Sequence, residues 1–420
     1  MEKTKISSGV NLYTLNINKF KTFTVSMYIH RKLNESEASL NALLPFVMKR
    51  GSKKYPDTVA VSETLESLYG GFFDCFIRKK GENQIIAFNF EFVAPQYIPN
   101  DSDYVNGVFG FINDMLFNPL TNGNSFNEEY VEREKQNLKD YIEGIINDKK
   151  EYANKRCIEE LCEGEAYAVY EYGSVENLDK INAKNLYEHY VEIMKTSVID
   201  VFVIGDIDSS PLKNALADSI KRDDVKEGYH IAKIKAPCDK VKVVTDKMEV
   251  NQGKLAMGFT TETAFDDEDS YALTMFNSVY GSGAHSKLFN NVREKLSLCY
   301  YAYSRLDKHK GIMLVNSGVE FENFEKAYNE ILAQLECVKK GEISDMEITA
   351  AKKYLVNMLR SLNDSAFSIE DFYLSGVITG NITTIEEYIE NIEKVTKEQI
   401  VEVAKKVKLN TVYYLTGKGE

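Results

Sequence analysis

The chain contains the same order of predicted helices and strands twice, and this duplication limits the folds open to it. Residues 177–206, NLDKINAKNLYEHYVEIMKTSVIDVFVIGD, resemble residues 391–419, NIEKVTKEQIVEVAKKVKLNTVYYLTGKG, at a constant offset. Each copy predicts a helix, a short connection and an apolar strand that ends near Gly205 or Gly417. The repeat indicates two similar halves.

The front parts of the two copies also match. Residues 24–52, TVSMYIHRKLNESEASLNALLPFVMKRGS, and residues 254–283, KLAMGFTTETAFDDEDSYALTMFNSVYGSG, each predict a strand, a polar loop, a helix and a Gly-Ser turn. Gly51 corresponds to Gly281, and in both copies a second helix, an aromatic-rich strand and a long apolar strand follow. This order predicts an α+β fold with two homologous halves, each a mostly antiparallel sheet covered by helices on one face.

A charged segment that contains one proline, KRDDVKEGYHIAKIKAPCDK, lies between the two copies. Such a segment is typical of a linker between domains. We therefore predict a first domain at residues 1–220, a linker at 221–240 and a second domain at 241–420.

Composition and charge exclude several classes of function. The net charge is −13, which argues against nucleic acid as a partner because phosphate binding needs a concentrated basic surface. No apolar run is long enough to span a membrane, and the first residues lack the pattern of a secretory signal. The six cysteines are scattered without a C-x-x-C pair and are expected to be reduced and mostly buried. We expect a cytoplasmic protein with no membrane and no nucleic-acid partner.

The first helix of the first half, in LNALLPFVMKRGS (residues 40–52), has no side chain that could perform chemistry. Its apolar residues recur at helical spacing, which predicts a buried face. Pro45 lies inside the helix, where proline removes one backbone hydrogen bond. The helix is therefore predicted to serve the fold and to line a wall.

The doubled order and these segments resemble the insulinase, pitrilysin and mitochondrial processing peptidase family of zinc peptidases. This resemblance implies two halves that face each other as a clam shell. In active members the first helix carries H-x-x-E-H, in which two histidines bind zinc and the glutamate is the general base. Counting back from Gly51 and Ser52, the motif positions fall on Ala42, Pro45 and Phe46. None of these residues binds zinc.

A register shifted by one residue places the motif at Asn41, Leu44 and Pro45, which also bind no zinc. The five histidines of the chain are widely separated and offer no replacement. We therefore predict no metal and no cofactor.

The family's third zinc ligand is a glutamate on a later helix of the first half. That helix is predicted at about residues 127–147, with Glu132, Glu134 and Glu143 available. Without histidines, we expect these acids to form a solvated helix face.

The second half keeps a different part of the family pattern. YGSGAHSKLFNNVREKLSLCYYAYS (residues 280–304) resembles the family's Gly-rich turn, R-E-K helix and aromatic strand. By matched position, the resemblance assigns to Arg293 and Tyr300 the roles of the Arg and Tyr that contact substrate beside the scissile bond. Guanidinium and phenol groups suit a carbonyl oxygen that gains negative charge.

The location of these two side chains is also predicted. Arg293 is expected on the helix face away from its apolar residues, which include Phe289, and Tyr301 and Tyr303 are expected to point away from Tyr300. The alternative is that Arg293 pairs with surface acids and Tyr300 only packs.

The resemblance implies that in some bacterial members one subunit binds zinc and a second, zinc-free subunit supplies the Arg and Tyr. An erased zinc site beside a retained Arg-Tyr pair therefore predicts a non-catalytic, substrate-binding subunit of such a heterodimeric zinc metallopeptidase. Its partner would be a zinc-bearing H-x-x-E-H subunit of similar size, and its substrate a peptide or small protein, held partly by strand addition. The alternative is a peptide-binding or scaffold protein with no role in proteolysis. The sequence contains no Ser-His-Asp, Cys-His or metal-ligand pattern that would support an independent enzyme with a new site.

Overall fold

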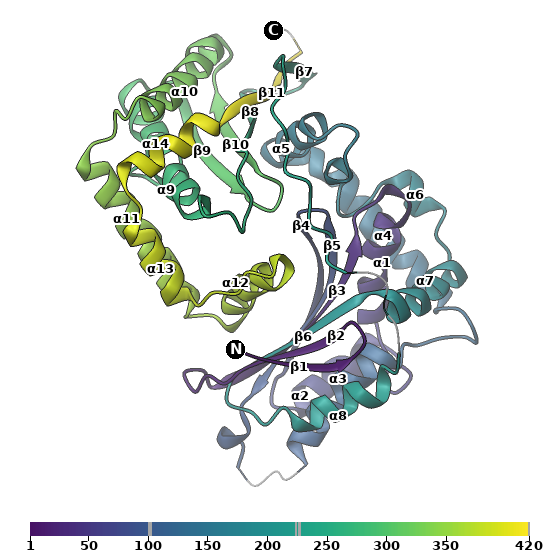
Figure 1. Ribbon diagram of the computed structural model, residues 1–420. Coiled ribbons are helices and arrows are strands. Elements are labelled where there is room, and N and C mark those ends of the chain that lie inside the picture. The colour runs from purple at the N-terminus through teal and green to yellow at the C-terminus, as the bar shows by residue number, and fades with distance from the viewer. Residues whose placement is uncertain (100–102, 223–224, 226–227, 419–420) are drawn as a thin grey trace. The chain divides into compact units, whose positions relative to one another are not determined.

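The computed structural model describes residues 1–99, 103–222, 225 and 228–418, and these residues pack into two compact units (Figure 1). Unit 1 is formed by three segments, Met1–Glu143, Val169–His230 and Ser365–Asp371. Unit 2 is formed by the other three, Gly144–Ala168, Ile231–Asp364 and Phe372–Glu420.

This packing divides the chain differently from the predicted boundaries at 220 and 241. Residues 144–168 belong to unit 2 because Ala153 and Cys157 on their helix pack into a cluster with Ala256 and Tyr413 of the second sheet. The short segment Ser365–Asp371 belongs to unit 1, and the predicted linker is divided after His230.

Unit 1 is built on a six-stranded sheet in the order β1-β2-β6-β3-β5-β4. Its strands are β1 (Glu2–Ser7), β2 (Val10–Leu15), β3 (Thr22–Lys32), β4 (Phe72–Lys80), β5 (Asn83–Val93) and β6 (Val198–Ile204). Its helices are α1 (Glu35–Lys49), α2 (Thr58–Ser67), η1 (Pro95–Tyr97), α3 (Tyr104–Phe117), α4 (Glu128–Gly144), α6 (Val175–Asp179), α7 (Ala183–Thr196) and α8 (Ser210–Ser219). Only β2 and β6 pair in parallel among the described strands of this sheet.

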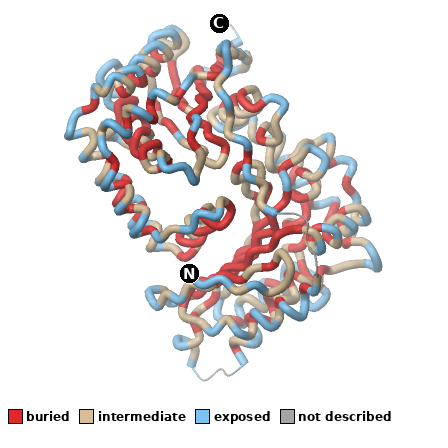
Figure 2. Tube along the Cα trace, viewed as in Figure 1, coloured by how far each residue is buried: buried red, intermediate tan, exposed pale blue. Residues whose placement is uncertain are grey.

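The alternation of β3 explains why helices cover one face of this sheet. Phe23, Val25, Met27 and Ile29 lie in one buried cluster with apolar residues of α1, α3, α4 and α7. The residues between them, such as Ser26 and His30, are also buried but polar, and they lie on the opposite face. Figure 2 shows the central strands β3, β5 and β6 of the unit as mostly buried.

The helix α1 begins as its sequence predicts and continues through Pro45. The Asn34 side chain caps it by accepting a hydrogen bond from the backbone N–H of Glu37 at 2.9 Å. Pro45 is buried within the helix. Because the helix is held by buried contacts along its apolar face, it tolerates the hydrogen bond that proline removes.

Unit 2 repeats this plan with a five-stranded sheet in the order β7-β11-β8-β10-β9. Its strands are β7 (Lys242–Met248), β8 (Gly253–Thr260), β9 (Cys299–Asp307), β10 (Ile312–Val319) and β11 (Lys408–Gly417). Its helices are η2 (Ile145–Asn147), α5 (Lys149–Leu161), η3 (Ala166–Ala168), α9 (Ser270–Tyr280), η4 (Leu288–Lys295), η5 (Phe321–Asn323), α10 (Phe324–Lys339), α11 (Asp345–Leu362), α13 (Ile385–Lys394) and α14 (Lys397–Lys406). Helix α12 (Ala366–Thr379) begins in unit 1 and ends in unit 2.

The predicted fold class is confirmed: each half is an α+β unit with a mostly antiparallel sheet. In unit 2 the helices α9, α10, α11, α13 and α14 pack with one another, as predicted, on one side of the sheet. Helix α5 adds contacts to β8 and β11 from the other side, which was not predicted. The clam-shell arrangement of the halves stays a prediction.

Candidate functional site

The positions that correspond to a zinc motif lie on α1 and carry no metal ligand. Ala42 and Pro45 are buried, and Phe46 packs partly buried against the core of unit 1. None of these side chains has a lone pair to donate to a cation. Among the described residues, no group of three or more His, Cys, Asp or Glu side chains is placed to hold a metal ion.

The shifted register brings Asn41 to the motif, and this residue belongs to a buried hydrogen-bond network. Its Nδ2 donates to Gln84 Oε1 at 2.8 Å, and its Oδ1 accepts from His189 Nε2 at 2.7 Å. Gln84 Nε2 in turn donates to the carbonyl oxygens of Ala38 and Glu171. The amide of Asn41 therefore joins α1 to β5 and α7.

His189 is the histidine that lies against α1, and it is held neutral. Burial lowers the pKa of His189 to about 4, although the nearby Glu37 carboxylate acts in the opposite direction. A neutral imidazole that uses Nε2 to bind Asn41 serves the packing of α7 on α1.

The prediction that the acids of α4 form a solvated face is wrong for Glu134. Glu132 and Glu143 are exposed, but Glu134 is buried and accepts a hydrogen bond from Arg50 Nε. Asn137 Nδ2 also donates to Glu134, at 3.1 Å. An ion pair between Arg50, which follows α1, and Glu134 therefore connects the two helices that carry the zinc ligands in the family's active members.

The sequence held a signal for this contact that the prediction did not use. Val131, Glu134 and Leu138 lie at i, i+3 and i+7 of one helix, so Glu134 shares the face of two buried apolar residues. A carboxylate on a buried face needs a charged or hydrogen-bonding partner.

Arg293 lies in η4, which forms a π-helix at Leu288–Lys295. This uncommon helix type is frequently found at functional sites. The Arg293 side chain is 39% exposed and pairs with Glu294 at 3.3 Å. Its guanidinium also lies over the ring of Phe289, with 4.6 Å to the ring centroid, so the prediction that it points away from Phe289 is wrong.

Tyr300 lies at an irregularity in the pairing of β9 with β10. Val319 pairs with Cys299 and Gly318 pairs with Tyr301, so Tyr300 is the extra residue of a β-bulge. Its side chain is 64% exposed, and its hydroxyl donates to Glu320 Oε1 at 2.8 Å. This hydrogen bond raises the pKa of Tyr300, so the phenol keeps its proton.

The aromatic neighbours of Tyr300 share one face of β9, and their predicted orientation away from Tyr300 stays a prediction. Tyr301 and Tyr303 lie on the face of β9 that meets α5, where the Lys150 ammonium lies 4.6 Å from the ring centroid of Tyr303. The structure thus places Arg293 and Tyr300 on two elements of unit 2, η4 and β9, that contact each other. The substrate-binding role of both residues stays a prediction.

The described helices include none with the length and apolar character needed to span a membrane. The cysteines are free: Cys75, Cys157 and Cys162 are buried, whereas the other three are exposed or half-buried.

Comparison with known proteins identifies the family of the chain. Residues 180–355 match the family model described as Peptidase M16 inactive domain. The chain is 34% identical to the probable inactive metalloprotease YmfF of Bacillus subtilis over 413 residues, which are 97% of this chain and 96% of the relative.

Solved structures show the same fold. The structure of a conserved protein from Enterococcus faecalis V583 superimposes with a TM-score of 0.91 at 30% identity and covers 100% of this chain and 99% of that chain. A peptidase M16 inactive domain from Pseudomonas fluorescens superimposes with a TM-score of 0.78 at 15% identity, over 100% of this chain and 99% of that chain. Similarity that extends over almost the full length of both chains shows that this protein belongs to the M16 peptidase family, as the sequence predicted, and is an inactive metallopeptidase homologue.

Proposed function

We propose that this protein is the non-catalytic, substrate-binding subunit of a heterodimeric zinc metallopeptidase. Its partner would be a subunit of similar size that carries H-x-x-E-H and binds the zinc. The observation that carries the proposal is the difference between the halves: Ala42 and Phe46 occupy the metal-ligand positions in unit 1, whereas unit 2 keeps Arg293 and Tyr300.

The chemistry of the retained pair supports a role at a partner's active site. Both side chains are at least partly exposed, and both end in hydrogen-bond donors. A preorganised donor to a carbonyl oxygen that gains charge typically contributes about 10²–10³ in kcat. The carboxylates of Glu294 and Glu320 hold the two donors until substrate replaces them.

The substrate would be a peptide or small protein bound partly by strand addition. Within the described residues, β4 and β9 are outer strands of their sheets, and each exposes an aromatic side chain, Phe72 or Tyr300. Main-chain hydrogen bonds at such an edge give affinity with little dependence on sequence. The site of action would be the cytoplasm.

The test is co-expression with the zinc-bearing partner, followed by peptidase assays. Arg293→Ala and Tyr300→Phe should each lower kcat/KM of the complex about 100-fold or more. Arg360→Ala, which removes an exposed arginine from α11 of the same unit, is the matched control and should leave activity unchanged. Full activity in both site variants would contradict the proposal.

The second candidate function is a peptide-binding or scaffold protein with no role in proteolysis. The observation in its favour is that Arg293 and Tyr300 already have acidic partners in their own unit, as structural residues would. Native purification separates the two functions, since a stoichiometric zinc peptidase subunit should accompany the chain only in the first case.

A further inference from the structure

Strand β7 leaves one edge of the second sheet unpaired. On one side β7 pairs in parallel with β11, from Lys242 opposite Thr411 to Met248 opposite Gly417. No strand within the described part of the chain pairs with its other side. The N–H and C=O groups along such an edge are a template for an added strand.

The first sheet has a strand at the equivalent position. There β2 pairs in parallel with β6, as β7 does with β11, and β1 then pairs antiparallel with the outer side of β2. The pairing runs from Glu2 opposite Thr14 to Ser7 opposite Val10. The repeat therefore shows what fits beside β7: an extended segment that runs antiparallel to it.

The side chains of β7 are divided between a packed face and an open one. Val244 and Met248 pack with the cluster around α5, and Asp246 pairs there with Arg156 at 3.4 Å. On the other face Thr245 is exposed and Val243 is 66% exposed. An exposed β-branched side chain on this edge strand would pack against side chains of an added strand.

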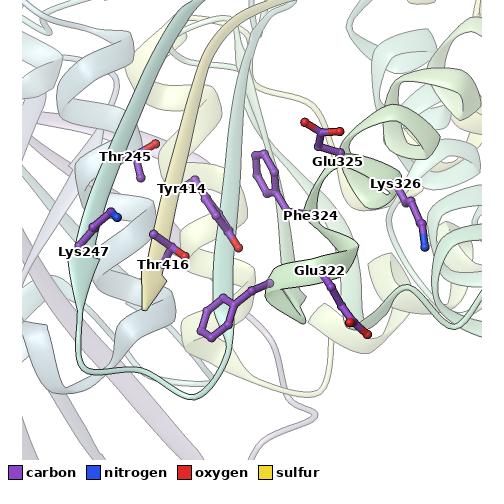
Figure 3. Close-up of a pocket in the computed structure, with 9 residues that line it drawn as sticks. Thr245, Lys247, Glu322, Phe324, Glu325, Lys326, Tyr414 and Thr416 are labelled. Carbon is purple, nitrogen blue, oxygen red and sulfur yellow. The ribbon is translucent and has the colours of Figure 1, made fainter. Parts of the chain in front are cut away.

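A pocket of about 460 Å³ lies on this open face (Figure 3). Thr245 and Tyr414 line it from neighbouring strands, and Phe321 and Phe324 line it from η5 and the start of α10. The ring centroids of Phe324 and Tyr414 are 3.9 Å apart, so the wall is aromatic. The volume is within the range of about 300–1,000 Å³ that is typical of ligand sites.

The charges around the pocket do not select a charged ligand. The exposed Glu322, Glu325, Lys247 and Lys326 contribute both signs. Specificity would therefore come from an apolar or aromatic group that packs on the rings, with the charged side chains at the rim.

We propose that the outer edge of β7 binds an extended polypeptide segment, antiparallel to the strand, and that the pocket receives a bulky apolar side chain of this segment. Side chains opposite Thr245 and Lys247 lie on the pocket's face because alternate residues of a strand share a face. The inference deepens the proposed function, since it rests on peptide binding and names a binding edge apart from Arg293 and Tyr300.

A second copy of the chain fits this site less well than a peptide does. Two β7 strands paired across a twofold axis would offer each other's pocket only Val243, Thr245 and Lys247. None of these side chains is a bulky apolar group that could fill an aromatic pocket of about 460 Å³.

The test uses the full chain and a strand-forming probe peptide, KTVTFTVTK, with KTVTATVTK as its matched control. Hydrogen exchange should show protection of the amides of residues 243–247 when the first probe binds. Fluorescence anisotropy should show at least about tenfold weaker binding of the alanine probe, because the phenylalanine occupies the pocket.

Variants of the chain test where the probe peptide binds. Phe324→Ala should weaken binding of KTVTFTVTK about tenfold, whereas Tyr97→Ala, which removes an exposed aromatic ring from η1 of unit 1, should not. Binding that protects β4 or β9 in place of β7 would overturn this inference and leave the proposed function standing. No binding up to about 1 mM probe, or a peptide-free dimer that protects β7, would also overturn it. The peptidase assay of Arg293→Ala tests the proposed function separately, because its result does not depend on whether a peptide binds at β7.

Discussion

The carboxyl group of Glu370 should make the stability of unit 1 fall as pH rises. Glu370 lies in Ser365–Asp371, the segment that packs in unit 1, and it is fully buried. Ser26 Oγ on β3 donates to its Oε2 at 2.9 Å. Burial raises the pKa of Glu370 to about 7, even though hydrogen bonds from Tyr28 and Ser26 lower it.

The charged groups near this carboxyl group have opposite effects on its pKa. Arg78 on β4 lowers the pKa of Glu370, and Asp371 raises it. Arg78 donates to Asp371, and the Lys80 ammonium lies 2.8 Å from the same carboxylate. Because these neighbours form their own ion pairs, burial is the largest influence on Glu370.

The magnitude follows from the shift. A carboxyl group that titrates at 4.5 when unfolded and at about 7 when folded changes the free energy of unfolding by about 3 kcal/mol. Between these two pH values the folded state binds more protons than the unfolded state. The stability is therefore full below the unfolded pKa and is lost as pH rises through 7.

Urea unfolding followed by circular dichroism suits a chain that has no tryptophan. Wild type should lose about 3 kcal/mol more than Glu370→Gln between pH 4 and pH 8, because the amide stays neutral. Glu63→Gln, an exposed change in the same unit, is the control and should keep the wild-type pH dependence. If Glu370→Gln and wild type lose stability equally, burial of Glu370 does not govern this pH dependence.

Three further outcomes follow from the contacts of the site and the turns. Arg50→Met should destabilise unit 1 by about 2 kcal/mol in urea unfolding, because Glu134 is left without its cationic partner; a change below about 0.5 kcal/mol would show that the pair is dispensable. Gly51→Ala should lower the melting temperature by several degrees, since a Cβ there would lie 2.5 Å from the carbonyl oxygen of Tyr55, and an unchanged melting curve would show that the turn adapts. Elemental analysis of the purified chain should find zinc far below one equivalent, and bound zinc that resists dialysis would contradict the reading of the motif positions.

The duplication made most of the fold predictable from the sequence. Two copies of one element order determine which strands are equivalent, and the parallel pairing of β2 with β6 recurs as that of β7 with β11. The assignment of α5 to unit 2 could not be predicted. Ala153, Cys157 and Leu161 recur at i, i+4 and i+8 and indicate a buried face, but such a pattern does not say which sheet the face will cover.

The sequence pattern identified Arg293 and Tyr300 as candidate site residues, but it did not predict the contacts that these side chains make. Tyr300 is the extra residue of a β-bulge, and no sequence signal marked this break in the β9–β10 pairing. Arg293 lies over Phe289 because residues four apart face each other on a helix, a spacing that the sequence already contained and the prediction did not use. Long-range pairs such as Arg50 with Glu134 depend on how α1 and α4 pack.

The loss of the zinc site in unit 1 is a change of packing as well as of ligands. A metal holds helices together by binding side chains from both, and here the ion pair of Arg50 with Glu134 connects α1 with α4 instead. Introducing histidines at Ala42 and Phe46 would not rebuild a site, because Pro45 supplies no general base and Glu134 is already paired with Arg50. A histidine introduced at the buried Ala42 without a metal or hydrogen-bond partner would be an unpaired buried polar group, which costs about 1–3 kcal/mol. In the first half, α1 and α4 are thus connected by an ion pair between side chains, without a metal ligand at Ala42 or Phe46.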